Sequence, residues 1–268
     1  MGNIFKYEFK MYQKSILIWT INLMLVILLM MVFYPTFGSD VALIDKMLEN
    51  YPEELLKAFG MSISLSLASV LGYFSFVFAM VQLFVAIQAA NYGFSILSVE
   101  EREFTADYLM SKPVSRVQIL IAKFSAAFLA LLFTNITIWI TTFVSLNLFS
   151  DGNPYDADKI VLLLSTVILF QLFFLTVGMA ISVFVRRIRS VLSFSLGLSF
   201  GTYILNTVRS IVGGETLGYL SPFYHFDPIK ILETGALNIP MVTISCIFIL
   251  GSLIITFILY KKRDIYSL

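Results

Sequence analysis

The stretch IVLLLSTVILFQLFFLTVGMAISVFV, which runs from Ile160 to Val185, contains no Asp, Glu, Lys or Arg. A helix that crosses the hydrocarbon core of a bilayer needs about 20 predominantly apolar residues, so this stretch is long enough for one crossing. Of the 268 residues in the chain, 59% are hydrophobic and only 13% are charged. Soluble domains carry about 25% charged residues, so this chain lacks the polar surface of a globule in water. We therefore predict an all-α integral membrane protein.

Five further stretches lack these four charged residue types. Four of them have the length of a single span, but the stretch from Ala58 to Val99 has room for one or two. The segment before it is acidic and the segment after it is more basic, which places its two ends on opposite sides of the membrane and favours one crossing. The predicted six-helix bundle has its spans at 16–35, 72–97, 120–148, 160–185, 190–208 and 239–260, in one transmembrane domain that covers residues 1–268.

Basic residues orient this bundle, because Lys and Arg collect on the cytoplasmic side of membrane proteins. Six crossings put both termini on the same side, and that side holds 13 of the 18 basic residues. We predict a multi-pass protein of a bacterial cell membrane with both termini in the cytoplasm. The net charge of +1 gives no reason to expect nucleic acid as a partner. The inside set is Lys6, Lys10, Lys14, Arg102, Lys112, Arg116, Lys123, Arg186, Arg187, Arg189, Lys261, Lys262 and Arg263, and the outside set is Lys46, Lys57, Lys159, Arg209 and Lys230.

Three segments between the spans have patterns of their own. Residues 3–14 place aromatic and lysine side chains on different helical faces, which suits either a helix lying on the cytoplasmic interface or a simple basic anchor. Outside, residues 40–60 favour two short amphipathic helices above the membrane. On the cytoplasmic side, residues 100–116 favour a short helix that ends before Pro113, with Phe104 and Tyr108 on one face. Such a segment is shaped to dock onto a partner, although an ordinary solvated connection would also fit.

The same cytoplasmic segment resembles the permease subunits of type-2 ABC exporters. Those subunits commonly carry a Glu-Glu-Arg-Glu-Gly-Thr-like run and then Leu-x-Ser-Lys-Pro-Val-Ser-Arg after the second span. This chain has EEREFT from Glu100 and LMSKPVSR from Leu109, followed by Lys123 at the position of the next family lysine. It departs from the pattern at Phe104, where the family has Gly. The resemblance extends to YPEELLKAFG from Tyr51, LSPF from Leu220 and the ending YKKRDI from Tyr260.

The resemblance implies a permease subunit of an ATP-driven exporter that forms the translocation path. Two six-span subunits, identical or homologous, would meet about this path above two cytoplasmic ABC ATPases. Closure of the ATPases on ATP would move the coupling segment and rock the bundles between two access states. Membrane lipids would surround the complex. On the resemblance, the ATPase-coupling residues are Glu100, Glu101, Arg102, Phe104, Tyr108 and Arg116.

Catalytic and cofactor chemistry is not expected in this chain itself. The nearest approach to a phosphate-binding loop runs from Gly213 to Gly218 and continues with Tyr219 instead of the lysine and hydroxyl that phosphates need. ATP and Mg²⁺ are therefore expected in a partner ATPase, and we predict no enzyme activity for this chain. The only histidine, His225, stands two residues before Asp227, but further metal or nucleophile partners are lacking, which favours an interfacial loop residue.

Small and neutral polar residues are the remaining features of the spans. Ser193, Gly197 and Gly201 recur at four-residue spacing in the fifth span, which allows another helix to approach closely, either within this chain or in a second subunit. The amides along the spans favour hydrogen bonds between helices over a polar path. No charged residue lies at mid-span, which argues against the rival interpretation of an ion-coupled secondary transporter. A non-transporting sensor or scaffold remains an alternative, since a fold does not fix an activity.

Overall fold

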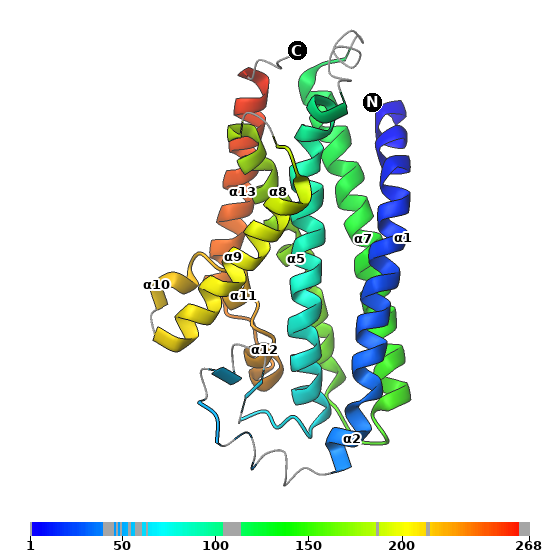
Figure 1. Cartoon of the computed structure of the whole chain (residues 1–268), viewed down its shortest axis with the longest axis vertical. Coiled ribbons are helices and arrows are strands. Elements are labelled where there is room, and N and C mark those ends of the chain that lie inside the picture. Colours follow the sequence, from blue (N-terminus) through cyan, green and yellow to red (C-terminus); the bar gives the residue numbers. More distant parts are fainter. Residues whose placement is uncertain are drawn as a thin grey trace.

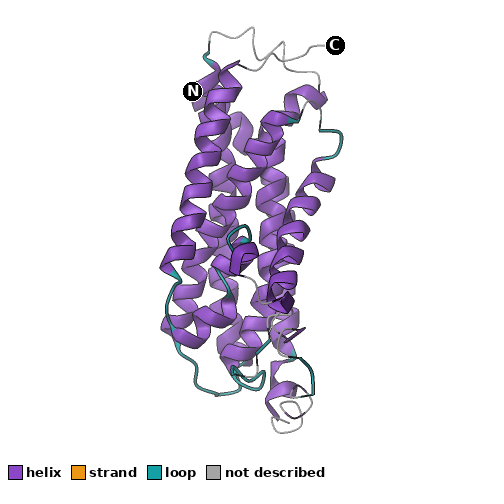
Figure 2. Ribbon diagram, turned by 90° about the vertical axis from the view of Figure 1, so that its left-hand side faces the viewer, coloured by secondary structure: helices purple, strands orange, loops and turns teal. Residues whose placement is uncertain are grey.

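The computed structural model describes residues 2–39, 46, 48, 50–52, 55–56, 61–62, 64–103, 114–185, 188–212 and 215–262. These residues form helices and loops without a strand, as Figure 2 shows. Six helices are long and apolar enough to cross a membrane, which confirms the predicted all-α bundle. They are α1 (Gly2–Val32), α5 (Val70–Glu103), α7 (Arg116–Phe149), α8 (Ala157–Phe184), α9 (Val191–Val212) and α13 (Ile239–Lys262).

Shorter helices lie at the ends of these six. Helix α2 (Tyr34–Ser39) follows α1, while α10 (Glu215–Gly218), α11 (Pro222–His225) and α12 (Pro228–Thr234) connect α9 to α13. Helix α1 begins and α13 ends at the same end of the bundle, at the top of Figure 1. The two amphipathic helices predicted within residues 40–60 fall mostly outside the described residues.

Helix α1 differs from its prediction. Residues 3–14 are helical, but they continue into the first span without a break, so they form no separate helix lying on the interface. Packing explains the difference: the Tyr12 ring lies 4.7 Å from that of Tyr92 on α5, and the Phe9 ring lies 5.9 Å from that of Phe133 on α7. These contacts hold the first turns of α1 against the bundle, and no Gly or Pro interrupts the helix after Gly2.

Helix α5 is the centre of the bundle. Helix α8 packs along it, and α9 crosses it obliquely (Figure 1). Helix α1 packs mainly along α7, and α13 packs along α8. The side chains of α5 are accordingly buried along most of its length, whereas α1, α9 and α13 leave large apolar side chains on the outside. In lipid, such an outward apolar surface needs no cover.

The contact between α5 and α8 is closest at two glycines. A Cβ atom added to Gly93 would overlap the carbonyl oxygen of Leu175, and one added to Gly178 would lie 3.2 Å from the carbonyl oxygen of Ala90. Ala89 and Ala90 are also fully buried. Small residues thus let the two backbones touch, which is how helices gain packing energy in a bilayer.

A Gly93→Ala substitution tests this contact. Alanine favours a helix by about 1 kcal/mol over glycine, so a loss of stability would have to come from the steric overlap. Overpacking of this kind costs about 1–3 kcal/mol. We expect the purified Gly93→Ala protein to unfold several degrees below the unmodified protein in detergent. Gly251→Ala is the matched control, because a Cβ there meets nothing within 4 Å and should leave the unfolding temperature unchanged or higher. Equal behaviour of the two variants would contradict the close α5–α8 contact.

Candidate functional site

The predicted coupling residues lie where α5 ends and α7 begins. Glu100, Glu101 and Arg102 belong to the last turn of α5, and Arg116 is the first residue of α7. Phe104 and Tyr108 lie outside the described residues. Their placement on one helical face therefore stays a prediction.

The start of α7 is fixed by a capping box. The Ser115 hydroxyl accepts a hydrogen bond from the backbone N–H of Gln118 at 3.2 Å, and the Gln118 side-chain oxygen accepts one from the Ser115 N–H at 3.1 Å. Each bond satisfies a backbone donor that the first turn of a helix leaves open. A displacement of the chain just before Ser115 would consequently be transmitted to the first turn of α7.

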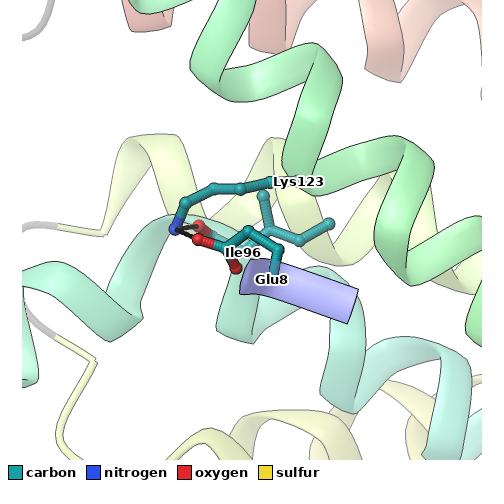
Figure 3. A network of polar contacts seen from close by, with 3 residues as sticks. All are labelled: Glu8, Ile96 and Lys123. Carbon is teal, nitrogen blue, oxygen red and sulfur yellow. Dashed lines mark hydrogen bonds and ion pairs between the residues drawn. The ribbon is translucent and has the colours of Figure 1, made fainter. Parts of the chain in front are cut away.

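A buried polar network lies two turns further into α7 (Figure 3). The Lys123 side chain is 1% exposed, and its Nζ donates a hydrogen bond to the Ile96 carbonyl oxygen of α5 at 2.9 Å. Nζ also lies 3.8 Å from a carboxylate oxygen of Glu8 on α1. Both ionic groups are about 10 Å from the ends of their helices, at 1.5 Å per residue, so they lie near the interface and not at mid-span. Lys123 thus joins the three helices that surround the α5–α7 connection.

The strip predicted on the fifth span lies on the outside of this chain. Ser193, Gly197 and Gly201 are exposed on α9, and an added Cβ at either glycine would meet nothing within 4 Å. Among the described residues, no helix therefore packs against the two glycines of this strip, and its role in a subunit contact stays a prediction. The inward face of α9 is a different row, in which Ser195, Ser199 and Thr202 are buried. The sequence pattern missed this row because serine and threonine at helical spacing also occur on exposed faces.

A family comparison identifies the class of protein. The model of the ABC-2 family transporter protein matches residues 2–265, which is nearly the whole chain. The chain belongs to the ABC-2 transporter family. No curated protein and no solved structure matched it. It is a multi-pass membrane protein of this family, as the sequence motifs after the second span indicated.

The segment between α10 and α12 of this transporter lies deeper in the bundle than its sequence predicted. LSPF was assigned to the outer side and His225 to an interfacial loop, and the structure shows that residues 221–226 are buried among α5, α8, α9 and α13. The Phe223 ring lies 5.2 Å from that of Phe170, which is about 20 Å into α8 at 1.5 Å per residue. The segment therefore dips into the bundle from the end opposite the termini.

Hydrogen bonds to other parts of the chain hold three polar groups of this dipping segment. Gln82 of α5 donates to the Phe226 carbonyl oxygen at 2.8 Å, and the Ser221 hydroxyl donates to the Thr202 carbonyl oxygen at 2.8 Å. The Nδ1 atom of His225 lies 2.6 Å from the Ser245 hydroxyl. Irregular backbone inside a membrane bundle is tolerated only with such partners.

His225 and Asp227 have separate hydrogen-bond partners. His225 pairs with Ser245, whereas Asp227 accepts the backbone N–H of Ile229 at 3.0 Å and caps α12. Burial lowers the pKa of His225 to about 4, although nearby backbone groups of Gly218 and Tyr219 act in the opposite direction. The ring is thus neutral at pH 7. No group of three His, Cys, Asp or Glu side chains suited to a metal occurs in the described part of this chain.

Several amides of the spans connect separate elements, whereas Asn22 and Asn206 have partners within their own helices. Gln88 of α5 donates to the Thr134 hydroxyl of α7 at 2.9 Å. Asn135 of α7 lies 3.5 Å from the side-chain oxygen of Gln171 on α8. Together with the Gln82 bond, these contacts hold the interior of the bundle in register.

A double-mutant cycle tests the Lys123 network. Lys123→Met removes the cation beside the largely buried Glu8 carboxylate, and loss of one partner costs about 3–5 kcal/mol in buried pairs. We expect a clear drop in the unfolding temperature of the purified protein, and a smaller drop when Glu8→Leu is added. Lys10→Met is the matched control, since Lys10 is exposed on the same helix as Glu8. Additive effects of the two substitutions, within about 0.5 kcal/mol, would contradict coupling between Glu8 and Lys123.

Proposed function

We propose that this chain is the permease subunit of an ATP-driven exporter and forms the translocation path. The observation that carries the proposal is the family match over residues 2–265 in a chain whose sequence lacks a phosphate-binding loop. Transport by a member of the ABC-2 family without that loop requires ATP and Mg²⁺ to bind to separate ABC ATPase subunits. The chain itself would then contribute no hydrolytic residue.

Coupling to the ATPase would occur at residues 100–116, between α5 and α7. In support, α5 ends and α7 begins at the end of the bundle that holds both termini. We propose that this end faces the cytoplasm, in keeping with the asymmetry of Lys and Arg. Glu100, Glu101, Arg102 and Arg116 would frame the contact, with Phe104 and Tyr108 as its aromatic centre.

Movement of the coupling segment would be transmitted through the Lys123 network. Because Lys123 binds the Ile96 carbonyl and faces Glu8, the cytoplasmic ends of α1, α5 and α7 are tied together. A displacement of the connection by the closing ATPases would therefore move these three helices as a unit. Rocking of this unit against a second bundle would open the path to alternate sides of the membrane.

A second permease subunit, identical or homologous, would complete the path. We propose that it contacts the outward strip of Ser193, Gly197 and Gly201. A Cβ added at Gly197 or Gly201 would meet nothing within 4 Å in this chain, and these small residues would let a neighbouring helix come close.

The coupling proposal predicts the behaviour of a Phe104→Ala, Tyr108→Ala double variant. Loss of both aromatic side chains should reduce the amount of ATPase that co-purifies with the chain at least several-fold, or abolish stimulation of ATP hydrolysis by transported compounds. Membrane insertion and the unfolding temperature should not change, because these side chains are expected to face the partner. Pull-down with quantified ATPase, followed by hydrolysis assays in reconstituted vesicles, measures both effects.

The matched control is Tyr51→Ala, which removes an exposed aromatic side chain from the segment predicted to lie outside. It should leave co-purification and hydrolysis unchanged. Normal ATPase binding together with normal stimulated hydrolysis in the Phe104/Tyr108 double variant would show that coupling takes place elsewhere.

A further inference from the structure

A cavity of about 340 Å³ lies beside the first turns of α9, at the end of the bundle that holds both termini. Its walls come from three helices: Phe94 of α5, Ile181 of α8, and Ser193, Phe194, Gly197 and Leu198 of α9. The volume falls in the range of about 300–1,000 Å³ that is usual for small-molecule sites. Because Ser193, Phe194 and Gly197 are exposed, the cavity opens to the surroundings of the bundle.

The lining is apolar apart from one hydroxyl. The Phe94 and Phe194 rings contact each other at 5.6 Å and form one wall, while the missing side chain of Gly197 leaves space between Phe194 and Leu198. Ile181 is one turn from the end of α8 at Phe184, so the cavity lies near the end of this predicted span. An apolar cavity at this depth is suited to a hydrocarbon chain.

A positive charge adjoins the polar edge of the cavity. The Ser193 hydroxyl lies 3.0 Å from that of Ser190, and Ser190 follows the exposed Arg189 directly in the chain. Arg189 precedes the lining residue Ser193 by four positions and stands just before α9 begins at Val191. Arginine side chains bind phosphate through two parallel hydrogen bonds and a full charge. The sequence has no Asp or Glu between Arg189 and Val212 to neutralise it.

We propose that this cavity binds one acyl chain of an anionic phospholipid whose phosphate is held at Arg189. The proposal goes beyond the transport function and does not depend on an ATPase. The lipid would fill the space between α5, α8 and the first turns of α9 and would fix the tilt of α9. Since Ser193 and Gly197 belong to both the cavity and the outward strip, the lipid would lie at the edge of the proposed subunit contact.

A side chain from a second copy is a less suitable occupant. In a symmetric pair that meets through α9, each Arg189 would approach the α9 of the other copy, which brings a second Arg189 and no acidic residue. Like charges placed together in a membrane interface are destabilising. A lipid phosphate supplies the missing negative charge and an acyl chain supplies the apolar volume.

Thermal unfolding of the purified full-length chain in detergent, titrated with lipid, tests the proposal. Phosphatidylglycerol should raise the unfolding temperature at lower concentration than phosphatidylcholine with the same acyl chains. Arg189→Gln should weaken the phosphatidylglycerol effect about fivefold, since one surface arginine near an anionic lipid contributes about 1 kcal/mol. Lys10→Gln is the matched control: it removes one exposed charge at the same end of the bundle but on α1, and it should have no effect.

A second variant probes the acyl chain. Ile181→Trp fills the cavity from α8 without altering the outward strip, and it should weaken binding of both lipids; Ile181→Met, which conserves the volume, should not. Arg189→Gln replaces an exposed side chain, so its result stands even if Ile181→Trp does not fold. The proposal would be overturned by equal responses of the unmodified and Arg189→Gln proteins to phosphatidylglycerol, or by inorganic phosphate alone reproducing the stabilisation. Loss of crosslinked dimer in Ile181→Trp with lipid binding intact would instead assign the cavity to a partner's side chain.

Discussion

The backbone contact between α5 and α8 at Gly93 and Gly178 is the constraint on which the rest of the bundle depends. Lipid tails are as apolar as leucine, so water does not drive these helices together, and close packing has to supply the energy. Helix α8 covers one face of α5, and α1, α9 and α12 pack against its other faces. The hydrogen bonds of Gln82 and Gln88 form on these faces, and they set the register of the dipping segment and of α7.

The two ends of the molecule use polar groups in different ways. At the end with both termini, Lys123 binds a backbone carbonyl of α5 beside the Glu8 carboxylate, and a capping box fixes the start of α7. At the opposite end, neutral bonds from Gln82, Ser221 and Ser245 hold residues 221–226 inside the bundle. A charged partner at the interface can strengthen or weaken the Lys123–Glu8 network. The neutral hydrogen bonds around residues 221–226 instead favour a fixed position of this segment. This arrangement is consistent with motion that begins at the end of the termini.

Hydropathy and charge were sufficient to predict the number of spans, because the length of an uncharged run is set by the bilayer thickness. They could not show that α1 continues through its lysines, since a basic interfacial helix and a basic helix end have the same pattern. Lys123 was assigned to the cytoplasmic set from its charge, and its burial depends on Ile96 and Glu8, which are distant in sequence. The Ser-Pro of residues 221–222 has the sequence of an outer loop. Its burial depends on hydrogen bonds to residues distant in sequence, from Ser221 to the Thr202 carbonyl oxygen and from Gln82 to the Phe226 carbonyl oxygen. The small residues of α9 were recognised, but their spacing alone did not tell which row faces inward.

We propose that closure of a partner ATPase moves the start of α7 together with α1 and α5, while the close backbone contact between α5 and α8 stays intact. Distances between spin labels measure this directly, in a chain where Cys246→Ser removes the natural cysteine. Labels at the exposed Phe84 of α5 and Val161 of α8 report on the core, and a label at the exposed Ile121 in each of two permease subunits reports on the first turns of α7. We predict that trapping the complex with ATP changes the distance between the two Ile121 labels by several ångströms, while the distance between labels 84 and 161 stays constant. An Ile121 distance that is the same with and without ATP, or a core distance that changes with it, would contradict this prediction.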